Sequence, residues 1–162
     1  MQQLPQREEM TRLGFYGLIP FAAGAVALWL SPWILPLHIA LDFHQIALVY
    51  GGLVIVYLAG VGGGAILTPK LKSTESFLPG QLIALVAFAA ILPSGVFFLS
   101  IGAAWRHAFI LILLIYLLMR DLGAVNDGLL PRWYGTLRIR LTFWAGLSIM
   151  MIISRLLLLG FY

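Results

Sequence analysis

Three histidines and one aspartate are the residues best suited to binding a metal ion or a haem: His38, Asp42, His44 and His107. His38 and Asp42 are four residues apart, so on a helix they would share a face. A metal site needs three or four converging ligands with supporting hydrogen bonds. Histidines in separate loops do not establish such a site. We therefore expect no metal or other cofactor and interpret the histidines as ordinary side chains at the membrane interface, with a metal or haem module as the less favoured alternative.

Arg155 is the residue that is most costly to place in a membrane. It follows Leu141 in the last apolar segment by a distance of roughly 21 Å along a helix. An ionisable group inside a membrane usually faces protein or a wet cavity and has a partner. We expect its guanidinium to snorkel outward beside Tyr162 and the terminal carboxylate. A buried pair with Asp42 and a contact with another subunit are the alternatives.

A glycine-rich run resembles a dinucleotide-binding pattern. The run Gly60-Val61-Gly62-Gly63-Gly64-Ala65 matches G-x-G-x-x-G/A, but it lacks both the βαβ unit and the suitably spaced acidic residue that such a site needs. We therefore expect no nucleotide. Gly52, Gly60 and Gly64 are separated by multiples of four, a spacing that lets helices approach closely in lipid. These glycines predict helix packing, either within the chain or against a partner.

Catalytic patterns are missing from the sequence. There is no H-E-x-x-H motif, no Ser/His/Asp order and no pair of facing carboxylates within the apolar segments. Transporters usually show polar groups near the bilayer midplane and broken helices. Pro20 and Pro93 could break helices, but only Arg155 is a candidate for a charge within a span. We expect a protein that is not an enzyme.

The composition defines the class of protein that must position these residues. Of the 162 residues, 62% are hydrophobic and 10% are charged, with a mean hydropathy of +1.00 and no cysteine. A soluble domain is about 45–50% apolar and about 25% charged. The absence of cysteine excludes a disulfide scaffold, a thiolate metal site and a cysteine nucleophile. The chain is therefore predicted to be a small polytopic membrane protein.

The apolar segments predict an all-α bundle of five transmembrane helices in a single domain. A spanning helix needs about 20 mainly apolar residues. Arg106 and His107 interrupt the third apolar region, so two interpretations compete: a fourth helix with Arg106 snorkelling to its near interface, or a fourth segment that does not span. The five-span interpretation gives helices over residues 13–33, 45–67, 77–100, 101–119 and 141–161.

The distribution of positive charge favours five spans. Cytoplasmic loops are enriched in Lys and Arg. Five spans place eight of the ten cations on one side and leave Arg106 and Arg155 on the other, whereas four spans give an even split. We therefore predict a cytoplasmic N-terminus and an external C-terminus. The net charge of +4 is explained by this bias and by anionic lipid, so we expect no nucleic-acid binding.

The segment 129–140 is predicted to lie at the membrane interface. Trp133 and Tyr134 suit the headgroup level, and Arg138 and Arg140 suit contact with lipid phosphates. The first apolar run is long for a cleavable signal peptide, and the short head contains acidic residues, unlike a mitochondrial transit peptide. We expect the inner (plasma) membrane of a bacterium.

Several stretches resemble the DUF3429 family of small five-span membrane proteins, which is related to mitochondrial transmembrane proteins. The most specific is Gly128-Leu129-Leu130-Pro131-Arg132-Trp133-Tyr134 with Leu137-Arg138 and Leu141-Thr142; the others are Leu13 to Phe21, Tyr50-Gly51, Leu58-Ala59-Gly60, Pro79 and Asp121. The resemblance implies five spans in a bacterial inner or mitochondrial membrane and no established activity. Two departures are Gly62-Gly63 where the family usually has a His-Trp pair, and a longer region between Pro79 and Asp121.

The leading functional hypothesis is a non-enzymatic accessory or assembly subunit of a larger membrane complex, respiratory or photosynthetic. It rests on the lack of catalytic groups, the glycine-rich helix and the large apolar surface. Trp29, Trp33 and Trp144 on the first and last helices would face lipid or other membrane subunits. The alternative is a small oligomeric transporter or channel that uses Pro20, Pro93 and the outer histidines.

Overall fold

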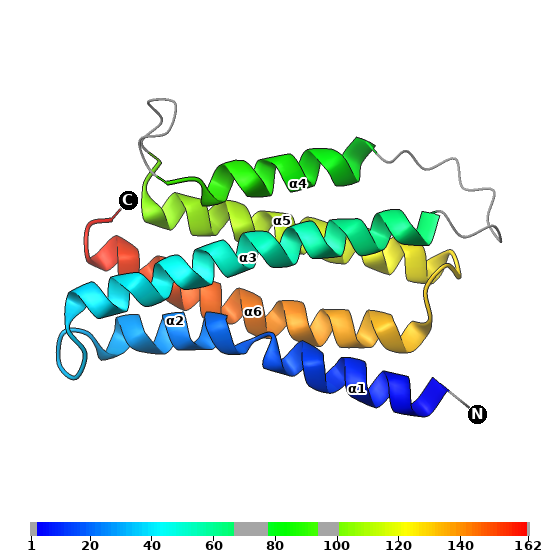
Figure 1. Cartoon of the computed structure of the whole chain (residues 1–162), viewed down its shortest axis with the longest axis horizontal. Helices are drawn as coiled ribbons and strands as arrows, with labels where there is room; N and C mark the ends of the chain where they lie inside the picture. The colour runs from blue at the N-terminus through cyan, green and yellow to red at the C-terminus, as the bar shows by residue number, and fades with distance from the viewer. Residues whose placement is uncertain (1–2, 67–77, 94–100, 162) are drawn as a thin grey trace.

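The computed structural model describes residues 3–66, 78–93 and 101–161, and these form an all-α bundle (Figure 1). Side chains are described for 7–64, 78–93 and 101–161. The helices are α1 (Gln3–Tyr16), α2 (Ile19–Leu30), α3 (Leu37–Ile66), α4 (Leu78–Ile91), α5 (Ala103–Asn126) and α6 (Arg132–Leu158).

The first predicted span occurs as two helices placed end to end. The α-helical hydrogen bonding of α1 ends around Gly17 and Leu18, and α2 begins immediately afterwards with Pro20 in its first turn. Proline fits there because the first backbone N–H groups of a helix have no partner within the helix. Figure 1 shows α1 and α2 together as one pass along the bundle, with α3, α4, α5 and α6 as the others. The two chain termini consequently lie at opposite ends, which we call the N-terminal end and the C-terminal end of the bundle.

Within the part of the chain that the structure describes, four segments are long and apolar enough to cross a membrane: Arg7–Leu30, Leu37–Gly64, Ala103–Asn126 and Arg132–Leu158. The prediction of an all-α, multi-pass membrane protein is therefore confirmed. The shorter apolar helix α4 has 14 described residues, about 21 Å at 1.5 Å per residue, against a hydrocarbon thickness of about 30 Å. Residues 77 and 94–100 of the predicted third span lie outside the described residues.

The turn between α5 and α6 is much tighter than the predicted interfacial segment 129–140. Gly128 has a φ of 75°, a left-handed conformation that glycine adopts without steric cost. The backbone N–H groups of Leu129 and Leu130 donate to the Ala124 carbonyl, and Pro131 directly precedes α6. Most of the segment 129–140 therefore forms the first turns of α6, antiparallel to the last turns of α5.

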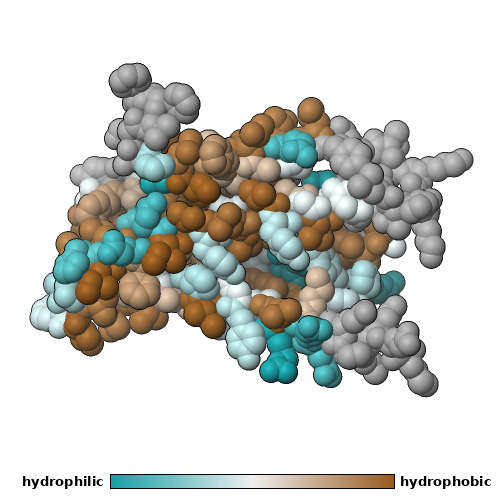
Figure 2. Space-filling view, in the orientation of Figure 1, coloured by the Kyte–Doolittle hydropathy of each residue, from teal (hydrophilic) through white to brown (hydrophobic). Residues whose placement is uncertain are grey.

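The core lies between the helices, while the outside of the bundle remains apolar. One cluster of buried side chains includes Leu48, Ile55, Ile110, Leu117 and Ile149, from α3, α5 and α6. A second cluster packs α2, α3 and α6 together nearer the C-terminal end. Figure 2 shows hydrophobic residues over much of the visible face of the bundle, with hydrophilic groups mostly toward its ends. Such a surface is suited to contact with a lipid bilayer.

The glycines of α3 lie in two different environments. A Cβ on Gly52 would collide with the Ile91 side chain of α4 and lie 3.6 Å from the Ala87 carbonyl oxygen. A Cβ on Gly60 or Gly64 would meet nothing within 4 Å among the described residues, and both glycines are exposed. Gly52 thus packs against another helix of the chain, whereas Gly60 and Gly64 face outward.

Adding one methyl group at each kind of site should have opposite effects on stability. Gly52→Ala is expected to lower the free energy of unfolding by about 1–3 kcal/mol, because the α3–α4 contact has no room for the methyl group. Gly60→Ala should instead raise it by about 0.5–1 kcal/mol, through helix propensity. Reversible unfolding in mixed micelles measures both values, and a neutral Gly52→Ala would contradict the close α3–α4 contact.

Candidate functional site

A buried ion pair joins α5 to α6 near the N-terminal end of the bundle. Arg138 Nε donates to Asp121 Oδ2 at 2.6 Å, and the Tyr134 hydroxyl lies 3.5 Å from the same oxygen. The side chains of Arg138 and Asp121 are only 7% and 8% exposed. Charges removed from water need such a partner, because an isolated buried charge is strongly destabilising.

The structure changes the interpretation of the residues predicted at the headgroup level. Tyr134 and Arg138 are buried and point toward α5, whereas Trp133 is half-buried and Arg140 is exposed. The reason is that this segment is helical from Arg132, and residues four apart in a helix share a face. Tyr134 and Arg138 therefore belong to the inner face of α6, while Trp133 and Arg140 keep positions compatible with lipid contact.

Two arginines at the C-terminal end of the bundle bind the carbonyl groups at the ends of neighbouring helices. Arg106 donates from Nε to the Ala90 carbonyl at 2.8 Å and from Nη2 to the Leu92 carbonyl at 2.5 Å, at the end of α4. Arg155 donates from Nε to the Leu28 carbonyl at 3.2 Å and from Nη2 to the Ser31 carbonyl at 2.5 Å, at the end of α2. The last carbonyl groups of a helix lack intrahelical partners and carry partial negative charge, so both guanidinium groups satisfy and neutralise them.

These contacts differ from those expected of Arg106 and from the alternative pair of Arg155 with Asp42. Tyr162, beside which Arg155 is expected to snorkel, lies outside the described residues. Arg106 does not snorkel to the interface but is buried, at 6% exposure. The structure pairs Arg155 with α2 rather than with Asp42, which lies on α3. The Arg155 guanidinium also lies 5.6 Å from the centre of the Trp29 ring, and Trp29 Nε1 donates to the Met151 carbonyl at 3.1 Å. Because α6 packs beside α2, Arg155 reaches the end of that helix first.

Two of the three histidines are buried against each other. The rings of His44 and His107 are 5.5 Å apart, and a ring nitrogen of His107 lies 2.9 Å from the Ala103 carbonyl oxygen. His38 is exposed. The helix α3 begins at Leu37, earlier than predicted, and this places His44 inside the bundle instead of in a loop. Within the described residues, no three His, Cys, Asp or Glu side chains are grouped so that they could hold a metal ion.

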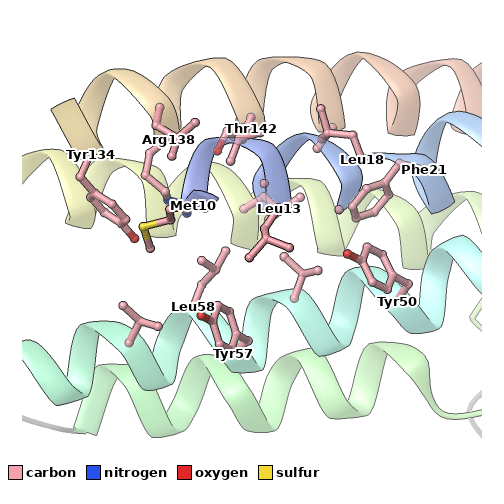
Figure 3. Close-up of a pocket in the computed structure, with 18 residues that line it drawn as sticks. Met10, Leu13, Leu18, Phe21, Tyr50, Tyr57, Leu58, Tyr134, Arg138 and Thr142 are labelled. Atoms are coloured by element: carbon pink, nitrogen blue, oxygen red, sulfur yellow. The ribbon is translucent and has the colours of Figure 1, made fainter. Parts of the chain in front are cut away.

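A cavity of about 280 Å³ lies beside the ion pair, between α1, α2, α3 and α6. In Figure 3, Tyr134, Arg138 and Thr142 of α6 lie on one side of it, opposite Tyr57 and Leu58 of α3. Most of the other lining residues are apolar: Met10, Leu13, Gly14, Gly17, Leu18, Phe21, Tyr50, Val54, Val61, Leu114, Leu137, Leu141 and Ala145. The cavity is therefore a mainly apolar chamber. Its charged residue, Arg138, lies with Tyr134 and Thr142 on the α6 side, which we call the polar wall, and Tyr50 and Tyr57 bring two further hydroxyl groups from α3.

The polar wall has a signal in the sequence that the prediction of an interfacial segment overlooked. Tyr134, Arg138 and Thr142 recur every four residues, so they form one stripe along a helix whose neighbours are mainly apolar. Asp121 lies in the preceding helix and completes the group. A polar stripe on a membrane helix indicates a face turned toward protein rather than toward lipid.

The chain matches a known family over most of its length. The model of a family described as "Protein of unknown function (DUF3429)" matches residues 6–154. No curated protein and no solved structure matches the chain.

The ion pair should behave as a coupled unit. Asp121→Leu and Arg138→Met are each expected to lower the free energy of unfolding by about 3 kcal/mol, because each leaves the other charge buried without its partner. The double variant should lose much less than the sum. The free energies of unfolding of the wild type, the two single variants and the double variant are measured in mixed micelles and form a double-mutant cycle. If the losses of the two single variants add up to that of the double variant, the pair is not coupled.

Removing the arginine at the end of α4 should destabilise the bundle. Arg106→Met leaves the Ala90 and Leu92 carbonyl groups without their donors, at an expected cost of about 2–3 kcal/mol. Arg140→Met removes an exposed arginine and should change the free energy of unfolding by less than about 0.5 kcal/mol. Equal stability of the two variants would argue against a capping role for Arg106.

Proposed function

We propose that this chain, which belongs to the DUF3429 family, is a non-enzymatic accessory or assembly subunit of a larger membrane complex, respiratory or photosynthetic. Its place would be the inner membrane of a bacterium. The observation that carries the proposal is an exposed stripe on α3 with no described residue against its two glycines.

The stripe consists of Leu53, Tyr57, Gly60 and Gly64, which we call the α3 stripe. Its spacing of four, three and four residues keeps these positions on one side of the helix. Leu53 and Tyr57 are 57% and 66% exposed, and the two glycines have open space above them. Small residues spaced four apart allow a second membrane helix to approach closely, where van der Waals contact stabilises association. The partner that fits is therefore a transmembrane helix of another subunit.

The buried charges favour a structural role over catalysis or ion transport. Arg106, Arg138 and Arg155 each bind a carbonyl or carboxylate group of this chain. Charges held in this way stabilise the bundle. Of their nitrogens, only Nη2 of Arg138 is buried without a partner among the described residues, and it belongs to a residue lining a mainly apolar cavity, which does not suit a hydrated substrate. This supports an accessory subunit over the alternative of a small oligomeric transporter or channel.

The proposed orientation has a cytoplasmic N-terminus and an external C-terminus. Cations such as Arg7, Arg12, Arg132 and Arg140 are on segments at the N-terminal end of the bundle. Arg106 and Arg155 lie at the C-terminal end, and both are bound to carbonyl groups. An excess of free positive charge on one side is typical of the cytoplasmic face.

Association can be tested by gentle extraction of the tagged protein, measurement of its native mass and identification of co-purifying chains by mass spectrometry. The wild-type protein is expected in one stoichiometric complex. Gly60→Leu should lose most of the partner, because the added side chain would occupy the space above the α3 stripe. Gly123→Leu is the matched control. A Cβ on Gly123 also meets nothing within 4 Å among the described residues, but Gly123 lies on α5 and not on the α3 stripe.

Two outcomes would contradict the proposal. If the wild-type protein is a monomer or a homo-oligomer under every extraction condition, the transporter alternative gains support. If Gly60→Leu and Gly123→Leu retain the partner equally, the α3 stripe is not the contact surface.

A further inference from the structure

The polar wall of the cavity contains two buried atoms without hydrogen-bond partners among the described residues. Arg138 Nη2 and Thr142 Oγ1 are both inaccessible and unpaired, and their residues are only 5% and 7% exposed. Both residues line the cavity and are four residues apart on α6, on one face of the helix. Buried donors and acceptors in proteins nearly always have partners. The cavity is the space beside both residues, so a molecule in it becomes their partner when each side chain turns its polar atom toward it.

The charge of the missing partner follows from the ion pair. Arg138 is already paired with Asp121 through Nε, so Nη2 is the part of the guanidinium that remains to be satisfied. Because Asp121 neutralises the positive charge, a second buried anion would lack a counter-charge. A neutral oxygen that accepts hydrogen bonds from Nη2 and from the Thr142 hydroxyl meets both requirements. A carbonyl group is such an acceptor.

The rest of the cavity requires an apolar molecule. Its volume of about 280 Å³ is far larger than one water needs and lies near the lower end of ligand pockets. Phe21, Tyr50 and Tyr57 add aromatic surface to a lining that is otherwise mainly aliphatic. Such walls favour the ring or chain of a lipid-soluble compound over several waters.

The position of the entrance fits a ligand that arrives from the membrane. Among the lining residues, Met10, Leu13 and Tyr57 are 40%, 62% and 66% exposed. They come from α1 and α3, whereas the polar wall belongs to α6 (Figure 3). The cavity therefore opens sideways between α1 and α3, past Leu13 and Tyr57, while Arg138 and Thr142 lie at its buried back.

We propose that this cavity binds a lipid-soluble molecule through a carbonyl oxygen, which accepts hydrogen bonds from Arg138 Nη2 and the Thr142 hydroxyl. Two sources offer this chemistry: the ring of an isoprenoid quinone and the ester region of a glycerolipid. The site involves only residues of this chain and does not depend on the accessory-subunit proposal.

Binding is tested on the purified full chain after its own lipids have been exchanged for detergent. The probes are decylubiquinone and a short-chain diacylglycerol, titrated separately by calorimetry. The Thr142→Val variant keeps the shape of the side chain but loses the hydroxyl. It should weaken binding of the active probe about tenfold, the loss expected for one hydrogen bond to a buried ligand. Thr136→Val makes the same change at an exposed position of α6 and should bind like the wild type.

A second variant tests the cavity without touching its polar groups. Val54→Phe places a ring in the chamber from α3 and should abolish binding. Val49→Phe is its matched control, because Val49 is exposed on the same helix and does not line the cavity. A cooperative thermal unfolding transition shows that each variant is folded. If Val54→Phe does not fold, the proposal is tested by the difference in probe binding between Thr142→Val and Thr136→Val.

The binding results distinguish a quinone from a glycerolipid as the ligand. Saturable binding of decylubiquinone alone, sensitive to Thr142→Val, supports a quinone, and the same result with diacylglycerol alone supports a glycerolipid. Mass spectrometry of a solvent extract of the untreated protein should then find the same class of compound. If neither probe binds, or if Thr142→Val and Val54→Phe bind like the wild type, the proposal is overturned and the polar atoms are satisfied by water only.

Discussion

The constraint on which this fold depends is that a membrane interior offers no water to the backbone, so the free carbonyl groups at helix ends must find donors within the protein. Among the described helices, α2, α4 and α6 end at the C-terminal end of the bundle. The last carbonyl groups of α2 and α4 are bound by Arg155 and Arg106. Each arginine belongs to another helix, so the capping contact also fixes one helix against its neighbour. A charged side chain in a membrane is costly when it has no partner. Here the two arginines instead stabilise the packing of α6 against α2 and of α5 against α4.

The N-terminal end of the bundle meets the same constraint only in part. Arg138 is paired with Asp121, yet its Nη2 and the Thr142 hydroxyl have no partners among the described residues beside an apolar cavity. The break after α1 matters here, because α1 and α2 are separate helices and the cavity lies where residues of both meet α3 and α6. At the C-terminal end, Ser31 Oγ, His44 Nδ1 and His107 Nε2 are likewise buried without partners among the described residues. What distinguishes Arg138 and Thr142 is that both residues line the cavity.

The helix α3 connects the two proposals. One of its faces packs closely on α4 at Gly52, and another forms the opening of the cavity at Tyr57. The α3 stripe includes Tyr57 as well as Gly60 and Gly64, so a subunit bound along the stripe would lie beside the cavity entrance. An accessory subunit with a lipid-soluble ligand at its contact surface is a coherent arrangement, although each proposal is tested separately.

Composition and pattern by themselves determined the class of this protein, because a bilayer demands long apolar helices and few charges. They also determined the approximate position of most helices, while the family was indicated by the resemblance of particular sequence motifs and is shown by the family match. Only the tertiary structure decided which way each helix faces. Tyr134 and Arg138 face α5, although the sequence predicted that they would face the lipid headgroups. His44 and His107 contact each other inside the bundle, and Arg155 binds the end of α2 and not Asp42. The physical reason is that 62% of the residues are hydrophobic and lipid accepts them on the outside as readily as the core does on the inside. Hydrophobicity therefore does not distinguish the two faces of a helix here, and the scarce polar groups reveal their partners only after the helices are packed.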